Sequence, residues 1–73
     1  MSRLPQVSGS DVVRVLQKLG FTIRRQHGSH IIMRRDTPFA QTVVPNHRQI
    51  DRGTLRAILR QSDLSVDEFT RLL

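Results

Sequence analysis

The chain has 73 residues, which is enough for one small domain but not for separate cofactor and substrate domains. It has no cysteine, which excludes disulfide bonds and thiolate metal sites, and its hydrophobic content of 37% is too high for a disordered tail. The formal net charge is +6, and Lys18 is the only lysine among twelve basic residues, so the other eleven are arginines. Because the arginine fork matches phosphate and stacks on bases, this composition points first to a nucleic-acid partner. A solvated surface that is merely basic is the alternative, and composition alone does not choose between the two.

The N-terminal residues carry no sign of a membrane or export segment. No apolar run approaches the roughly 20 residues of a membrane helix, and residues 1–11 lack the apolar stretch of a secretory signal. We therefore expect a cytoplasmic protein with no membrane partner. We expect one domain over residues 1–73, in which residues 1–7 form a short tail because they contain a proline and show no periodicity.

The first half of the sequence predicts a helix followed by a β-hairpin. Ser8 or Ser10 can cap the helix, Asp11 lies in its first turn, and Gly20 ends it. Residues 21–26 and 30–34 alternate as half-buried strands, and residues 27–29 form a three-residue turn between them. Helical spacing gives the helix one apolar face: Val12, Val13, Leu16 and Leu19.

A three-residue turn fixes which side chains share a face of the hairpin. In that register Gln26 pairs with His30, and Arg24 pairs with Ile32. The core face would then carry Phe21, Ile23, Ile31 and Met33. The opposite face would carry Thr22, Arg24, Gln26, His30, Ile32 and Arg34.

The second half predicts a short strand and two helices. Residues 41–44 form the strand, which follows a turn at 36–38 and is stopped by Pro45. Asp51 caps the next helix, with Ile50 and Leu55 as a hydrophobic staple, and residues 65–68 are a capping box for the last helix. The side chains expected inside are Leu55, Ile58, Leu59, Val66, Phe69, Leu72 and Leu73; Phe39 and Met33 are also assigned to packing.

These elements define an α+β fold with the order α-β-β-β-α-α. Turns of hairpin length make the three-stranded sheet antiparallel, and the helices can cover only one of its faces. The prediction is a two-layer domain whose other sheet face is open to solvent or to a ligand.

His30 is the candidate proton-transfer residue because it lies on the open face among arginines. A histidine can move a proton near neutral pH, and arginines can hold a phosphate and stabilise developing charge. RNA supplies its own nucleophile, the 2′-hydroxyl, so such a site can cut RNA without a metal or a protein nucleophile. Ser29 and His30 are adjacent on a strand and point to opposite faces, so a Ser–His relay is not expected, and no metal signature is present. The alternative is an ordinary surface histidine.

Two further features have both a functional and a structural interpretation. Arg52, Arg56 and Arg60 lie four residues apart on one side of the second helix, as a phosphate track or as a solvated helix face. His47 lies between the last strand and that helix, as a second proton carrier, as part of an RNA surface, or as a residue that fixes the loop.

The order of several motifs resembles the HicA toxins, also called YcfA-like proteins, of bacterial toxin–antitoxin pairs. The resemblance runs from about Ser8 to the end. It is carried by Leu19-Gly20-Phe21, by Arg25-Gln26-His27-Gly28-Ser29-His30 with Met33, by Val44-Pro45-Asn46-His47, by Gly53-Thr54-Leu55-Arg56-Ala57-Ile58-Leu59 and by Leu64-Ser65-Val66-Asp67-Glu68-Phe69.

The resemblance implies a fold similar to the double-stranded-RNA-binding domain and a ribosome-independent mRNA endonuclease that needs no metal or other cofactor. It places the family's catalytic histidine on His30 and implies a HicB-like antitoxin partner. A non-catalytic double-stranded-RNA-binding module and a small basic assembly protein are the alternatives. The residues expected to bind RNA are Arg24, Arg25, Gly28, Ser29, Arg34, His47, Arg52, Arg56 and Arg60.

Overall fold

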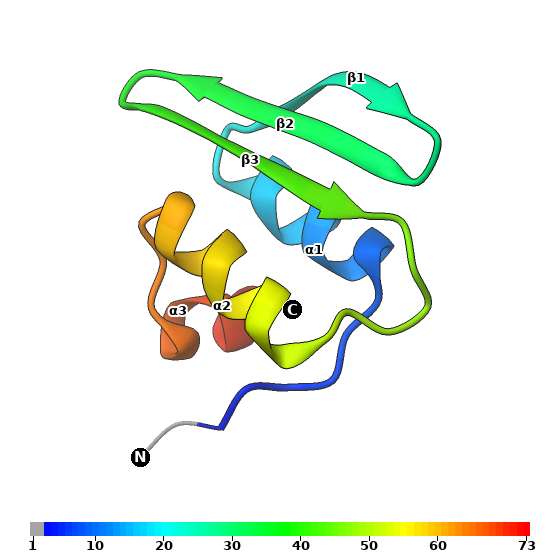
Figure 1. The fold of residues 1–73 in the computed structure, drawn as a ribbon. Helices are drawn as coiled ribbons and strands as arrows, with labels where there is room; N and C mark the ends of the chain where they lie inside the picture. Colours follow the sequence, from blue (N-terminus) through cyan, green and yellow to red (C-terminus); the bar gives the residue numbers. More distant parts are fainter. Residues whose placement is uncertain (1–2) are drawn as a thin grey trace.

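The helices and strands follow one another in the predicted order. The computed structural model describes residues 3–73 (Figure 1). It contains helix α1 (Gly9–Lys18), strands β1 (Thr22–His27), β2 (His30–Asp36) and β3 (Phe39–Pro45), and helices α2 (Arg52–Gln61) and α3 (Val66–Leu72). The α+β class and the order α-β-β-β-α-α are confirmed. Strand β3 is longer than predicted and includes Pro45. An edge strand tolerates a proline because no neighbouring strand needs a backbone N–H on its unpaired side.

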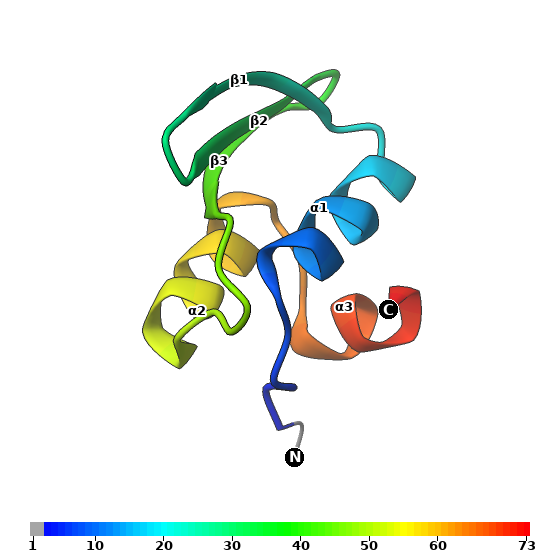
Figure 2. The same cartoon turned by 90° about the vertical axis from the view of Figure 1, so that its right-hand side faces the viewer.

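The three strands form one antiparallel sheet in the order β1-β2-β3. All three helices lie on the same side of this sheet, as Figures 1 and 2 show from two directions. Helices α1 and α2 pack mainly against β3. Within residues 3–73, no helix covers the other side of the sheet, called the open face from here on (Figure 2).

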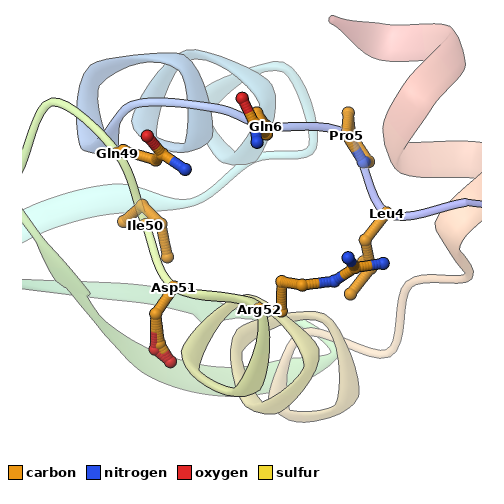
Figure 3. Close-up of a pocket in the computed structure, with 7 residues that line it drawn as sticks. All are labelled: Leu4, Pro5, Gln6, Gln49, Ile50, Asp51 and Arg52. Carbon is orange, nitrogen blue, oxygen red and sulfur yellow. The ribbon is translucent and has the colours of Figure 1, made fainter.

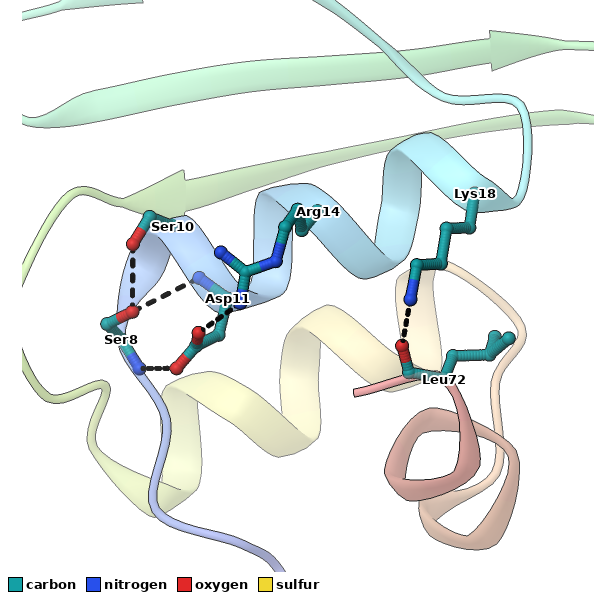
Figure 4. Close-up of polar contacts among 6 residues, drawn as sticks. All are labelled: Ser8, Ser10, Asp11, Arg14, Lys18 and Leu72. Atoms are coloured by element: carbon teal, nitrogen blue, oxygen red, sulfur yellow. Dashed lines mark hydrogen bonds and ion pairs between the residues drawn. The ribbon is translucent and has the colours of Figure 1, made fainter.

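Local hydrogen bonds fix both ends of α1. The Ser8 hydroxyl accepts from the Asp11 N–H at 3.1 Å, and the Asp11 carboxylate accepts from the Ser8 N–H at 3.0 Å, so Ser8 is the cap (Figure 4). The backbone bond from Ser8 lowers the pKa of Asp11, and the Arg14 side chain adds to the effect. At the other end, Gly20 has φ of 92°, and its N–H donates to the carbonyl of Gln17.

The other two helices begin on the predicted caps. Asp51 accepts from the Thr54 N–H at 3.0 Å, and Ser65 forms a reciprocal capping box with Glu68. Hydrogen bonding to the backbone of Ser65 lowers the pKa of Glu68. The C-terminal ends of α1 and α3 are joined by the Lys18 ammonium, which donates to the Leu72 carbonyl at 2.7 Å (Figure 4).

The core between the layers contains most of the predicted side chains. Val12, Leu16, Phe21, Ile31, Met33, Leu55, Ile58, Leu59 and Phe69 are buried as expected. Three assignments were wrong: the exposed fractions are 48% for Ile23, 68% for Phe39 and 46% for Leu73. Ile23 lies on β1, an edge strand that is exposed along its whole length because the helices pack against the other edge. Phe39 lies at the end of an edge strand, and Leu73 is the last residue.

Residues 3–7 of the predicted tail are packed against the domain, although within these described residues there is no helix or strand, and residues 1–2 lie outside the described part of the chain. Leu4 and Val7 are buried and belong to the core. The Ile50 N–H donates to the Val7 carbonyl at 2.9 Å, which ties this segment to the start of α2. Isolated apolar residues give no periodic signal, so the sequence pattern did not indicate this packing.

Candidate functional site

His30 is the first residue of β2, and its side chain is exposed. Across the sheet it lies opposite His27 on β1 and Pro45 on β3. The turn before it is held by the Asn46 N–H, which donates to the Ser29 carbonyl at 2.6 Å. His30 therefore stands on a strand that is paired on both sides, which gives it a fixed position at one end of the sheet.

The hairpin register near this site differs from the predicted one. The turn has two residues, Gly28 and Ser29, and not three, because Gly28 takes φ of 55° at the first central position. His27, and not Gln26, is therefore the residue opposite His30, and Arg25, and not Arg24, is opposite Ile32.

A β-bulge absorbs this shift farther along the strand. Arg24 is the extra residue of β1, so Ile23 pairs with Met33 and Thr22 with Arg34 as predicted. The predicted register is thus right for the first two residues of β1 and wrong by one position near the turn.

The register makes His27 a site candidate that sequence reasoning did not select. Residues directly opposite one another in an antiparallel pair have Cβ atoms about 5 Å apart and share a face. The sequence does show two histidines that flank Gly28-Ser29, but they lie opposite each other only if the turn has two residues, and the sequence pattern did not give the length of the turn. The open face therefore presents two imidazoles side by side.

Three of the four arginines of the hairpin lie together on the open face, farther along the strands from this pair. A hollow of about 310 Å³ is lined by Arg24 and Arg25 from β1, Ile32 and Arg34 from β2, and Gln41 from β3. We call this hollow the arginine basin. The Arg34 guanidinium is half-buried and lies 3.0 Å from the carboxylate of Asp36, which offsets part of its charge.

Not every arginine of the hairpin lies in the basin. The Arg35 guanidinium stacks over the Phe21 ring, 4.7 Å from its centroid, and donates to the carbonyls of Pro38 and Leu19. These contacts join β2 to the end of α1, so Arg35 is part of the structure of the domain.

His47 lies in the loop between β3 and α2, close to the start of α1. Its carbonyl accepts from the Gly9 N–H at 2.8 Å, and its side chain is exposed. The backbone of His47 therefore anchors the loop through a group that every residue carries, and the imidazole lies at the surface. Pro45 before it lies directly opposite His30, so the loop leaves the sheet beside the histidine pair.

The predicted arginine stripe of α2 is exposed but lies in the other layer. Arg52, Arg56 and Arg60 are exposed on a helix that packs under the sheet, on the side away from the open face (Figures 1 and 2). The Arg52 side chain points toward Leu4 and borders a small hollow of about 100 Å³ between the N-terminal segment and α2 (Figure 3). The residues predicted to bind RNA therefore form two separate groups.

The remaining predicted residues, Gly28 and Ser29, form the turn of the hairpin. Gly28 is exposed, with nothing within 4 Å of where a Cβ would lie, and Ser29 is half-buried. Within residues 3–73, no three histidine, aspartate or glutamate side chains are grouped so that they could hold a metal ion. Over the same residues, no helix is long and apolar enough to span a lipid bilayer.

Comparison with known families identifies the class to which this fold and site belong. The family model described as "HicA toxin of bacterial toxin-antitoxin" matches residues 9–64, which include all three strands, α1, α2, both hairpin histidines and the arginine basin. The chain belongs to the HicA toxin family. It is therefore the toxin member of a toxin–antitoxin system, and membership implies an antitoxin partner. No curated protein matches the chain.

Proposed function

We propose that this protein is an mRNA endonuclease that works without a metal ion, the toxin of a type II pair that inhibits translation and growth until a HicB-like antitoxin binds it. Family membership supports the toxin role, and the observation that carries the enzymatic proposal is the exposed His30 beside a basic basin on the open face. We place this activity in the cytoplasm, where mRNA is the substrate.

His30 would act as the general base. Its imidazole takes the proton from the 2′-hydroxyl of the substrate, and the 2′ oxygen attacks the neighbouring phosphorus. The bond from phosphorus to the 5′ oxygen breaks, and this oxygen takes up a proton as it leaves. The products are a strand with a 2′,3′-cyclic phosphate and a strand with a 5′-hydroxyl. His27 lies directly opposite His30 and is the residue that we expect to supply the second proton.

The basic residues would bind the substrate and fix its position. Guanidinium groups of the arginine basin make charge-assisted hydrogen bonds to phosphate oxygens, which hold the RNA strand in place over His30. We retain Gly28, Ser29 and His47 as RNA contacts because they lie around His30 at the same end of the sheet. Arg52, Arg56 and Arg60 would bind a more distant part of a structured RNA, because they lie in the helix layer.

The test is cleavage of a defined RNA by the purified protein with a chelator present. The native protein should cut, and His30→Ala should lose about 10²–10⁴-fold in rate, the usual contribution of general acid–base catalysis. Gln17→Ala, an exposed change on α1, is the control and should cut at the native rate. Circular dichroism should be the same for all three proteins, since His30 is exposed and its truncation opens no cavity.

Each result has a defined meaning. A folded His30→Ala protein that cuts at the native rate would show that His30 is not the base. A native protein that binds RNA but never cuts it would favour the non-catalytic double-stranded-RNA-binding module. Bacteria that cannot tolerate the native gene should tolerate the His30→Ala gene, and co-expression of the HicB-like protein should restore growth.

A further inference from the structure

The β-bulge of β1 brings two consecutive arginines to the same hollow. In a regular strand, neighbouring side chains point to opposite faces, so Arg24 and Arg25 would be separated by the sheet. Arg24 is the bulged residue, and both side chains line the arginine basin on the open face. The bulge thus places a third guanidinium beside those that a regular hairpin would supply.

Within residues 3–73, the charge of the basin is balanced only in part. Among the described residues that line it, none is acidic. Arg34 has its ion pair with Asp36 at the rim, whereas neither Arg24 nor Arg25 forms an ion pair with any of residues 3–73. Guanidinium groups held close together repel one another, so an anion bound among them would stabilise this arrangement. Phosphate is the anion whose oxygens the planar fork matches best.

The position of the basin relative to His30 suggests which phosphate it receives. The basin runs along β2 from Ile32 to Arg34, and Ile32, at its near end, is two residues from His30, a separation of about 7 Å. This is close to the spacing of successive phosphates along one RNA strand. A strand whose scissile phosphate lies over the pair His27 and His30 would therefore place the next phosphate over the basin.

We propose that the arginine basin is a binding subsite for the RNA phosphate adjacent to the scissile one. This rests on the proposed function, which puts the scissile phosphate at His30. The subsite contacts a phosphate that does not react, so its binding energy is the same in the ground state and the transition state. The subsite would thus determine the minimum length of RNA that the protein binds tightly. It would contribute to KM and not to kcat.

Binding of short RNAs to the inactive protein tests the proposal without depending on cleavage. Three ligands are titrated into His30→Ala by NMR at constant ionic strength: a dinucleotide with one internal phosphate, the same dinucleotide with a 5′-phosphate, and the same with a 3′-phosphate. One of the two terminal phosphates should lower Kd by about tenfold, and the one that does so identifies the side of the cut that the basin binds.

Matched variants separate the basin from general electrostatic attraction. Adding Arg24→Gln and Arg25→Gln to the His30→Ala protein should abolish the gain from the terminal phosphate. Adding Arg14→Gln and Arg71→Gln, which remove the same charge from exposed positions on α1 and α3, should leave the gain intact. A gain that survives in the basin variant, or no gain from either terminal phosphate, would overturn the proposal.

Kinetics provide a second readout that distinguishes this proposal from the catalytic one. On a long RNA, Arg24→Gln with Arg25→Gln should raise KM and leave kcat unchanged. A loss of kcat at unchanged KM would overturn the subsite. Failure of the native protein to cut would contradict the proposed activity, and the binding series would still decide whether the basin holds a phosphate.

Discussion

The contact between α1 and the loop after β3 depends on the absence of a side chain at Gly9. A Cβ built on Gly9 would overlap the carbonyl oxygen of Pro45 and lie 3.0 Å from the Cα of Asn46. Both are backbone atoms, so no side chain can rotate away to make room. The Gly9 N–H also donates to the His47 carbonyl at 2.8 Å. Gly9→Ala should therefore push the helix and the loop apart.

The net effect follows from three terms. Forcing extra volume into a tight contact costs about 1–3 kcal/mol, and weakening the hydrogen bond costs about 0.5–1.5 kcal/mol. The higher helix propensity of alanine returns up to about 1 kcal/mol. We expect the free energy of unfolding of Gly9→Ala to fall by about 1–3 kcal/mol. In a domain of this size each kcal/mol corresponds to about 4–8 °C in Tm, so a thermal melt can resolve the change.

Gly53→Ala is the matched control, because Gly53 also lies in the first turn of a helix. A Cβ there would lie 3.5 Å from a carboxylate oxygen of Asp51, an ordinary contact. Its Tm should stay the same or rise by a few degrees, since alanine favours the helix by up to about 1 kcal/mol. If Gly9→Ala melts at or above the native temperature while Gly53→Ala behaves as expected, the loop does not depend on this close approach.

Three further predictions follow from the caps and the charge. Asp63, just after α2, has φ of 57°, a conformation that costs less for glycine than for a residue with a Cβ. Asp63→Gly should therefore raise the free energy of unfolding, measured in urea, by about 0.5–1 kcal/mol. A loss of stability would show that the carboxylate contributes more than the backbone strain costs. The pKa values of Asp11 and Glu68 are lowered below their ordinary 3.8 and 4.5, so the stability that these carboxylates contribute is complete above about pH 5 and is lost as the pH falls through the folded-state values. The free energy of unfolding of the Asp11→Asn, Glu68→Gln variant should therefore depend less on pH in the acid range. An unchanged dependence would contradict this prediction. RNA affinity should fall steeply with salt, with a slope of several units in a plot of log affinity against log salt, and a flat plot would mean that the basic surfaces do not bind RNA.

The ends of the helices could be predicted from the sequence because their causes are local. A cap depends on a side chain and a backbone group about three residues apart, so Asp51 and the box of Ser65 with Glu68 were predictable without the rest of the fold. Gly20 was predictable for the same reason, since positive φ favours glycine there.

The packing of single residues was less predictable. Ile23 alternates correctly for a core position, but whether a helix covers β1 depends on where the helices dock, which the strand pattern does not contain. Leu4 and Val7 show the opposite error, because they are buried by contacts with a distant part of the chain. Burial of this kind is a property of the tertiary structure.

The candidate site depended on one residue of register. The two-residue turn brings His27 opposite His30. Without any other change, it would shift every residue of β1 by one position relative to β2, compared with the predicted register, and turn the wrong side chains toward the core. The bulge at Arg24 prevents this, because it restores the pairing of Ile23 with Met33 and lets the start of β1 keep its orientation. No residue type in this stretch marks a bulge, and the predicted register met the core pattern equally well. The turn and the bulge therefore act together: one forms the histidine pair, and the other places two consecutive arginines in the basin beside it.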